Sequence, residues 1–217
     1  MSLAIFDLDN TLLGGDSDYL WGQFLVEKGI VDSQLYEKEN QRFYDEYKLG
    51  KLDIYEFLRF SLKPLKEHDI KQLETWREEF IAEKINTIVL PKAHELVDSH
   101  RERGHTLMII TATNSFVTQP IADLYGIEFL LATEPQMESG QYTGEVSGIP
   151  CFQEGKVTNL NTWLKNNNRD LKGSYFYSDS HNDLPLLKLV DNPVAVDADE
   201  ILVKAANENA WPLLSLR

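Results

Sequence analysis

Two aspartates separated by one residue stand near the start of the chain, directly after the apolar run 3–6. In an extended segment, residues two apart point to the same side, so the carboxylates of Asp7 and Asp9 should face one site. Two carboxylates held together repel each other unless a cation lies between them or one takes a proton. Mg²⁺ is a hard cation that prefers oxygen ligands and also binds substrate phosphates. The pair therefore indicates a candidate magnesium site, with an acidic strand end of no function as the simpler alternative.

A second pair of aspartates, Asp179 and Asp183, follows another apolar run, 175–177. Their spacing of four residues would allow one carboxylate to bind a metal ion while the other supports the site. Ligands of open parallel sheets bind at the carboxyl ends of the strands. If both strands are central, the two pairs of carboxylates converge, although this spacing alone is more typical of a solvated turn or a helix cap.

Two further positions could hold a phosphate group. Thr111 follows the apolar run 106–110, where its hydroxyl and the amide of Ala112 could bind phosphate oxygens. Lys156 is expected to open a helix after a turn at 154–155, where its ammonium and the helix N-terminus would both favour a negative charge. Taken singly, a threonine at a strand end is usually structural and a lysine is usually solvated. Thr111 and Lys156 therefore indicate a phosphate site only in combination with the two pairs of aspartates.

The apolar runs that precede these residues predict a sheet. They are continuously apolar, which is typical of strands covered on both faces, as in a parallel sheet. Helical patterns alternate with them, one from Pro91 to Gly104 and another with apolar residues from 157 to 164. This alternation predicts an α/β fold with a Rossmann-like, doubly wound parallel sheet. The four runs are 3–6, 106–110, 175–177 and 193–196.

The segment 16–85 breaks this rhythm, because it contains no convincing strand and several amphipathic helical patterns. An all-helical insertion after the first strand indicates a cap. We therefore predict a core of residues 1–15 and 86–217 and a helical cap of residues 16–85, in which the third helix ends before Pro64. Ser139-Gly140 should form the turn of a small hairpin within the core. The expected cap helices lie around 20–25, 35–47, 54–58 and 73–81.

The composition excludes several classes of partner. The 217 residues include 21 Lys and Arg against 35 Asp and Glu, and the formal net charge of -14 would repel nucleic-acid backbones and anionic lipids. No apolar run reaches the length of about 18 residues that a membrane span needs, and the N-terminal run is too short for a signal peptide. Cys151 is the only cysteine, so no intrachain disulfide can form. We expect a cytoplasmic protein with no nucleic-acid or membrane partner, whose oligomeric state the sequence leaves open.

Together, the motifs resemble those of one enzyme family. Residues 7–11 read DLDNT, Thr111 follows the second strand, Lys156 follows the expected hairpin, and residues 179–183 read DSHND. In this order they resemble the haloacid dehalogenase superfamily of phosphatases, and more narrowly its phosphoserine-phosphatase-like branch (subfamily IB), which has a helical cap between the first two motifs. The resemblance covers essentially the whole chain. It implies a Mg²⁺-dependent phosphomonoesterase that acts on a small-molecule phosphate ester through a phospho-aspartyl intermediate.

The resemblance also implies a role for each matching residue. Asp7 would attack phosphorus, and Asp9 would protonate the leaving alcohol and then activate water. These roles make physical sense, because a carboxylate nucleophile divides hydrolysis into two easier displacements and an alkoxide leaves poorly without an acid. Thr111 and Lys156 would hold the transferring phosphoryl group. The implied metal ligands are Asp7, Asp179 and the backbone carbonyl of Asp9, with Asp183 in support and Asn182 near the phosphate.

The cap departs from the phosphoserine phosphatase pattern. Those enzymes carry a glutamate that contacts the substrate amine, and Asp16 takes its place here. They also use a cap arginine against the substrate carboxylate, whereas alignment on residues 50–52 puts Ser61 at that position. Arg59, two residues earlier, would point about 200° away on a helix. The amine contact would survive through Asp16 or Asp18, and Arg59 stays a candidate substrate contact although the carboxylate contact looks lost.

This pattern favours a small amino-alcohol phosphate without a carboxylate, such as histidinol phosphate, with phosphoserine as the other candidate. Trp21, Phe24 or Phe57 could contact an imidazole, although a buried cap core is the more usual place for such side chains. Three alternatives keep the motifs. They are a phosphatidylglycerophosphate phosphatase, a phosphoryl transferase such as a sugar-phosphate mutase and, least favoured, a metal-binding module without turnover.

Overall fold

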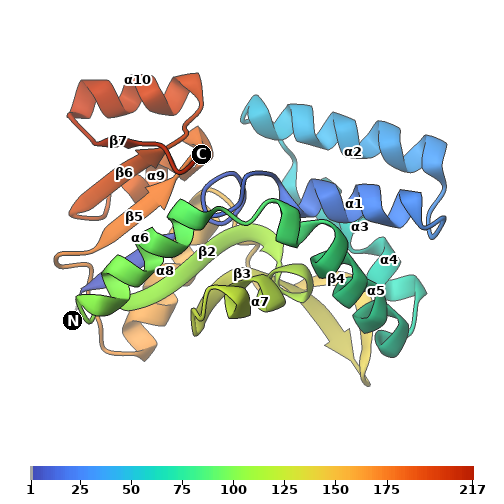
Figure 1. Ribbon diagram of the computed structural model, residues 1–217. Helices are drawn as coiled ribbons and strands as arrows, with labels where there is room; N and C mark the ends of the chain where they lie inside the picture. Colours follow the sequence, from blue (N-terminus) through green and yellow to red (C-terminus); the bar gives the residue numbers. More distant parts are fainter. Residues whose placement is uncertain (1) are drawn as a thin grey trace.

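The computed structural model describes residues 2–217. Its strands form one sheet of seven, with helices packed around it (Figure 1). The strands are β1 Leu3–Phe6, β2 Thr106–Asn114, β3 Phe129–Glu138, β4 Gln141–Ser147, β5 Tyr175–Ser178, β6 Asn192–Val196 and β7 Leu213–Leu214. Their spatial order is β4-β3-β2-β1-β5-β6-β7, and among these six strand pairs only β3–β4 is antiparallel. The predicted α/β fold with a largely parallel sheet is confirmed. Met1, part of the predicted core, lies outside the described residues.

Strand β1 lies at the centre of the sheet, between β2 and β5. Its four residues are fully buried, as the continuous apolar run predicts. Ile5 pairs with Met108 on one side and with Phe176 on the other. Since β1, β2 and β5 run parallel, the residues that follow these strands emerge at the same edge of the sheet.

Helices cover both faces of the sheet. The core helices are α6 Pro91–Glu102, α7 Ser115–Leu124, α8 Glu154–Asn166, α9 Leu184–Leu187 and α10 Glu200–Asn209, with the 3-10 helices η1 Ile85–Thr87 and η2 His181–Asp183. Side chains alternate along a strand, so Ala4 and Phe6 of β1 join the hydrophobic cluster that contains α6 and α7. Leu3 and Ile5 join the cluster that contains α8, α9 and α10. The helices and the sheet thus form the layers that the alternating pattern predicts.

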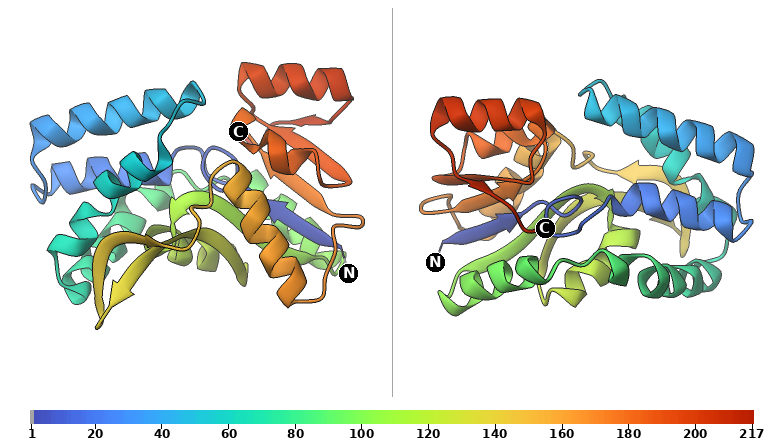
Figure 2. Two further views of the ribbon diagram at one scale, coloured as in Figure 1. Left: turned by 180° about the vertical axis from the view of Figure 1, so that it is seen from behind. Right: turned by 45° about the horizontal axis from the view of Figure 1, so that its top comes forward.

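A further group of helices, here called the helical segment (residues 17–83), lies between β1 and α6 along the chain. Its members are α1 Ser17–Glu27, α2 Ser33–Lys48, α3 Ile54–Ser61, α4 Lys63–Glu67 and α5 Ile70–Glu83. They gather beside the β3–β4 hairpin, beyond the carboxyl end of β1 (Figure 2). The division into a core and a cap at residues 16 and 85 stays a prediction. Within residues 2–217, no helix is long and apolar enough to cross a bilayer.

Aspartates begin most helices of the helical segment. The side chains of Asp16, Asp32, Asp53 and Asp69 accept hydrogen bonds from amides in the first turns of α1, α2, α3 and α5. A carboxylate at this position satisfies free amides and also suits the positive end of the helix dipole. Part of the acidic composition is therefore used to start helices.

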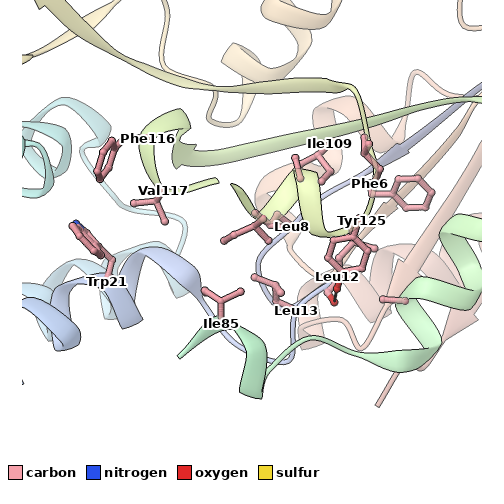
Figure 3. Packing of buried hydrophobic residues seen from close by; sticks show 14 of the residues in the cluster. Phe6, Leu8, Leu12, Leu13, Trp21, Ile85, Ile109, Phe116, Val117 and Tyr125 are labelled. Atoms are coloured by element: carbon pink, nitrogen blue, oxygen red, sulfur yellow. Dashed lines mark hydrogen bonds between the residues drawn. The ribbon is translucent and has the colours of Figure 1, made fainter. Parts of the chain in front are cut away.

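A continuous hydrophobic core joins the helical segment to the sheet (Figure 3). Leu8 and Leu12, in the loop after β1, are fully buried. The Tyr125 hydroxyl donates a hydrogen bond to the carbonyl of Leu12 at 2.6 Å. On the far side of the loop, Trp21 packs edge to face against Phe116, with ring centroids 6.0 Å apart. The loop that carries the first motif is therefore held by packing on both sides.

Some expected boundaries were wrong. Strand β2 continues to Asn114, so Thr111 lies inside the strand, because pairing between Asn114 and Thr133 extends the ladder beyond a register shift. Helix α8 begins at Glu154, so the turn expected there is the first turn of the helix. The third helix does end before Pro64, but Pro64 then lies in the first turn of α4, where its missing N–H needs no partner.

The predicted hairpin turn is confirmed. Ser139 and Gly140 have φ values of 50° and 81°, the left-handed conformation that a two-residue hairpin turn favours. The first hairpin strand, β3, runs from Phe129 to Glu138. From Phe129, β3 first pairs in parallel with β2 and only later pairs with β4, so it belongs to the sheet as well as to the hairpin.

Candidate active site

Lys156 connects two of the predicted carboxylates. It lies in the first turn of α8, and its Nζ is 2.8 Å from Asp7 Oδ1 and 2.8 Å from Asp183 Oδ2. All three residues are buried. Burial opposes the positive charge of Lys156, but Asp183 and Asp7 outweigh it and raise the lysine pKa. A charged lysine therefore lies between the residue that follows β1 and the segment that follows β5.

Asp7 has a partner at each oxygen. Its Oδ1 accepts from Lys156, and its Oδ2 lies 3.2 Å from the hydroxyl of Thr11. Burial raises the pKa of Asp7 to about 7 against the lowering effect of Lys156. The Thr11 hydroxyl is also 3.3 Å from Asp179 Oδ1 and accepts a hydrogen bond from the Asp179 amide at 3.1 Å. One threonine thus links the ends of β1 and β5, a role that the sequence analysis missed although Thr11 belongs to the first motif.

Asp9 points toward the helical segment and β2. Its Oδ1 accepts from the amide of Ser17 at 2.6 Å, at the start of α1, and its Oδ2 accepts from the Thr113 hydroxyl at 2.8 Å. The hydroxyl of Thr111 lies farther from the same oxygen, at 3.4 Å. Burial and the charge of Asp16 raise the pKa of Asp9 to about 6, against the lowering effect of the Ser17 and Thr113 hydrogen bonds. A carboxyl that titrates near neutrality is suited to giving and taking a proton.

Thr113 is the second residue that the sequence analysis missed. It lies two residues beyond Thr111 on β2, so both side chains project from the same face of the strand. The spacing of two is the signal that would have found it. Because Thr113 donates the shorter bond to Asp9, it holds that carboxylate more directly than Thr111 does.

Asp183 contacts Lys156, and no hydrogen bond links it directly to Asp7 or Asp179 among the described residues. It accepts from Lys156 and from the Ser178 hydroxyl at 2.7 Å. Asp179 is linked to Asp7 through the Thr11 hydroxyl, which lies within 3.3 Å of a carboxylate oxygen of each. Burial raises the pKa of Asp179 well above its usual range, and the charges of Asp7 and Asp183 add to this effect.

The oxygen atoms around Asp7 and Asp179 suit a small hard cation. Among residues 2–217, no three His, Cys, Asp or Glu side chains are grouped as a metal site. Of the expected metal ligands, only Asp7 and Asp179 would bind through their side chains. The carboxylate of Asp9 is bonded to Ser17 and Thr113, so Asp9 would bind the ion through its backbone carbonyl. Mg²⁺ is commonly held by one or two carboxylates together with water and substrate oxygens. The chemistry of these donors therefore fits Mg²⁺.

Asn182 connects the motif at residues 179–183 to the helical segment. Its Oδ1 accepts from Gln153 Nε2 at 2.8 Å, and its Nδ2 donates to the backbone carbonyl of Tyr47 at 3.1 Å. Tyr47 lies in the last turn of α2. Nearby, Gly50 has a φ of 65°, and a Cβ atom there would lie 2.8 Å from His181 Nε2. The end of α2 therefore rests closely on the loop that follows β5.

One cavity lies between the sheet and the helical segment. The core residues that line it include Asp7, Asp9, Thr111, Ala112, Lys156, Asn182 and Asp183. The helical segment contributes the aromatic residues Tyr19, Phe43, Tyr44, Tyr47 and Phe57 and the carboxylate of Asp18, and the N-cap residue Asp16 precedes it. Lys156 is the only lysine or arginine among the described residues that line it. The cavity thus combines the predicted reactive groups with an acidic and aromatic wall.

Three cap residues named in the sequence analysis lie away from this cavity. Arg59 lines a separate hollow with Gly144 and Glu145 of the hairpin, on another side of α3. Trp21 and Phe24 are buried in the core of the helical segment, where their rings stack 5.5 Å apart. Of the three aromatic candidates, only Phe57 lines the cavity.

Comparison with known proteins shows the family of the chain. The sequence model of the haloacid dehalogenase-like hydrolase family matches residues 4–188. The chain belongs to this family. A histidinol-phosphatase of Neisseria meningitidis serogroup C (strain 8013) is 44% identical to this hydrolase over 220 residues, which cover 100% of the chain and 99% of that protein.

Two solved structures resemble this hydrolase. A protein of unknown function from Bordetella pertussis Tohama I is 39% identical, with a TM-score of 0.94 and coverage of 100% of this chain and 99% of that one. A phosphoserine phosphatase, solved as an analogue of its phospho-aspartyl intermediate, has the same fold, with a TM-score of 0.72, 20% identity and coverage of 100% and 93%. The family resemblance, the fold and the predicted class of enzyme, a phosphatase, are confirmed.

Proposed function

We propose that this hydrolase releases phosphate from a small phosphate monoester through a phospho-aspartyl intermediate on Asp7, and that its substrate is histidinol phosphate. The observation that carries the proposal is the buried, charged Lys156 at 2.8 Å from Asp7, with the carboxyl of Asp9 in the same cavity. A nucleophile, a cation for the phosphoryl group and an acid are thus within reach of one substrate.

In the first step, a carboxylate oxygen of Asp7 attacks phosphorus, and the bond from phosphorus to the ester oxygen breaks. Asp9 gives its proton to that oxygen, which leaves as the alcohol. Lys156, the hydroxyl of Thr111 and the amide of Ala112 hold the phosphoryl oxygens and stabilise their charge. Asp183 holds the lysine in place.

In the second step, Asp9, now ionised, takes a proton from water while the water oxygen attacks phosphorus. The bond from phosphorus to Asp7 breaks, which frees the carboxylate and releases inorganic phosphate. Mg²⁺, held by Asp7, Asp179 and the backbone carbonyl of Asp9, would offset the charge of the phosphoryl oxygens as a Lewis acid.

The wall of the cavity supports histidinol phosphate over phosphoserine. Phosphoserine carries a carboxylate, which would face Asp16 and Asp18 with no arginine or lysine besides Lys156 among the described lining residues. Histidinol phosphate has the same ammonium but carries an imidazole group in place of the carboxylate, and both of these groups suit an acidic and aromatic wall. The name of the 44% identical Neisseria relative agrees with this choice.

The test is release of inorganic phosphate from L-histidinol phosphate, L-phosphoserine and p-nitrophenyl phosphate, with MgCl₂ and with EDTA. Asp7→Asn should lower kcat/KM at least about 10³-fold, because an amide cannot replace the carboxylate nucleophile. Asp123→Asn, at an exposed aspartate of α7, is the matched control and should keep wild-type activity.

Each part of the proposal can fail separately. Full activity of Asp7→Asn would exclude the nucleophile, and faster turnover of phosphoserine than of histidinol phosphate would exclude the substrate. Activity that persists in EDTA would count against Mg²⁺. Transfer of phosphate to a second substrate, with none released as free phosphate, would favour a phosphoryl transferase.

A further inference from the structure

Gln153 has a backbone conformation that is rare for a residue with a side chain. Its φ of 47° and ψ of -118° form a combination that glycine adopts readily and other residues adopt only at a cost. Gln153 is the N-cap residue of α8, yet its side chain makes no capping hydrogen bond. Glycine or a short polar side chain would suit this position better. The glutamine is therefore unfavourable for the helix that it begins, and any benefit must come from what its side chain contacts.

A tight turn before α8 imposes this conformation. The amide of Phe152 donates to the carbonyl of Pro150 at 2.9 Å, and the amide of Gly155 donates to the carbonyl of Phe152 at 2.8 Å. A Cβ atom on Gly155 would lie 2.0 Å from the carbonyl oxygen of Pro150, so the chain is folded back closely on itself. The Lys156 amide then donates to the carbonyl of Gln153 at 3.0 Å. The turn thus sets the start of the helix that carries Lys156, and it holds Gln153 in its strained conformation.

The side chain of Gln153 reaches the loop that follows β5. Its Nε2 donates to Oδ1 of the buried Asn182 at 2.8 Å. The Nδ2 of Asn182 donates to the carbonyl of Tyr47 at 3.1 Å and to the hydroxyl oxygen of Ser180 at 3.2 Å. Because the oxygen and the nitrogen of an amide exchange places when the group turns over, a donor on one side fixes where the nitrogen lies. Gln153 therefore keeps Nδ2 of Asn182 on the side of Tyr47.

The same two elements also meet through aromatic rings. The rings of Tyr47 and Phe152 have centroids 6.0 Å apart, and both residues line the cavity. Phe152 directly precedes Gln153, so the turn before α8 contacts Tyr47 through a ring and, by way of Asn182, through a hydrogen bond to its carbonyl. That carbonyl lies in the last turn of α2, where carbonyls lack their usual partners within the helix. The turn before α8 thus holds the end of α2 at the wall of the cavity.

We propose that Gln153 is a positioning residue, which keeps the Asn182 amide turned toward Tyr47 and so holds the end of α2 in place for the substrate. The strained backbone is retained because it delivers this side chain to Asn182. The inference rests on the proposed phosphatase function. Among the residues described, the Gln153 side chain makes no hydrogen bond to Asp7 or Lys156, the groups proposed to act on the phosphoryl group. Its loss should therefore raise KM and leave kcat almost unchanged.

Two substitutions separate the contact from the strain. Gln153→Met keeps the length and the Cβ atom, and hence the strain, but cannot donate to Asn182. Gln153→Gly removes the side chain and the strain together. In both variants, KM for L-histidinol phosphate should rise by about fivefold to tenfold, as for one lost hydrogen bond. The melting temperature of Gln153→Gly should exceed that of Gln153→Met by about 2–4 °C, because only glycine relieves the strain.

Asn168→Gly is the matched control. Asn168 also has a positive φ, 51°, but it is exposed just beyond the other end of α8. Its KM should stay within about twofold of the wild type. A merely structural role of Gln153 predicts a different pattern, because activity would then follow stability and Gln153→Met would be clearly less active than Gln153→Gly.

Amide hydrogen exchange tests the contact without relying on turnover. At the end of α2, the amides of Gly50 and Lys51 donate to the carbonyls of Tyr47 and Glu46 at 3.0 Å and 2.9 Å. Their exchange should be about threefold to tenfold faster in both Gln153 variants, because this end opens more often when one hydrogen bond is lost. Exchange in Asn168→Gly should match the wild type.

Three results would overturn the inference. They are a wild-type KM in either Gln153 variant, a loss confined to kcat, or equal melting temperatures of the two variants. If the wild type does not hydrolyse histidinol phosphate, the proposed substrate is wrong, and exchange at Gly50 and Lys51 then decides the role of Gln153. Faster exchange in both variants would support that role, and unchanged exchange would exclude it.

Discussion

The two sides of the cavity are built differently. On the side of the sheet, each carboxylate has partners in the protein, as Lys156 binds Asp7 and Asp183 and two donors hold Asp9. On the side of the helical segment, the wall is aromatic, and Asp18 has no partner among the described residues. Groups that carry out a reaction must be held in one geometry before the substrate arrives. A group that recognises the substrate keeps its bonding capacity for it.

The largest effect is expected from Lys156→Met, which breaks the pairing on the side of the sheet. The variant leaves Asp7 and Asp183 buried without their cation, so the free energy of unfolding should fall by about 3 kcal/mol. Phosphate release should fall by about 10³-fold, because the phosphoryl oxygens lose a positive charge. Urea unfolding and p-nitrophenyl phosphate turnover measure the two effects.

Lys165→Met is the control for this change, because Lys165 is an exposed lysine of the same helix. It should alter neither stability nor turnover appreciably. If Lys156→Met were as stable and as active as the control, the side of the sheet would not depend on its central ion pairs, and the contrast between the two sides would be wrong.

An intermediate effect is expected at Gly50, where the two sides meet. Gly50→Ala places a Cβ atom 2.8 Å from His181 Nε2, so the His181 ring or the end of α2 must shift. We expect kcat/KM to fall by about tenfold, equivalent to about 1.4 kcal/mol, because the shift disturbs the contact between the end of α2 and the loop after β5, where Asn182 lines the cavity. Steady-state kinetics with histidinol phosphate measure it.

Gly29→Ala is the matched control for the backbone. Gly29 has a similar φ of 67°, but nothing lies within 4 Å of the added Cβ atom. Both variants should lose stability by about 1 kcal/mol, since alanine is strained at positive φ, while only Gly50→Ala loses activity. Equal activity of the two variants would show that the contact between Gly50 and His181 does not matter for turnover.

The smallest effect is expected from Thr113→Val, which removes one of the bonds that hold Asp9. Turnover should fall by about fivefold to tenfold, as for one hydrogen bond to a carboxylate. Thr118→Val is the control, because Thr118 is also buried but its hydroxyl bonds to the carbonyl of Asn114 and not to the site. Similar kinetics for both variants would mean that the Thr113 hydroxyl is not needed to position the carboxylate of Asp9.

The sequence was most informative where strands position the chemistry. The apolar run before Asp7 predicted a strand covered on both faces, and parallel strands bring their carboxyl ends to one edge of the sheet. The convergence of the reactive groups depended on β1 and β5 being central, and the structure places them side by side in the middle of the sheet. The same period of two along β2 could have pointed to Thr113, but a threonine in a strand is too common to be singled out without its contact to Asp9.

The sequence was least informative in the helical segment. An amphipathic pattern shows that a helix has a buried face, but it does not show which partner covers that face. Trp21 and Phe57 therefore looked equivalent, although the structure buries Trp21 in the core and places Phe57 at the cavity. Arg59 and Asn182 depend in the same way on packing between segments distant in the chain, with the hairpin and with Tyr47 respectively.

The hydrogen bond from the Ser17 amide to Asp9 couples two parts of the catalytic cycle. Ser17 is the first residue of α1, so any swing of that helix away from the sheet stretches this bond. If this happened as the product alcohol left, it would weaken a bond that favours ionised Asp9 and so make Asp9 a stronger base for the water of the second step. The position of one helix would in this way tune the group that serves both steps of the reaction.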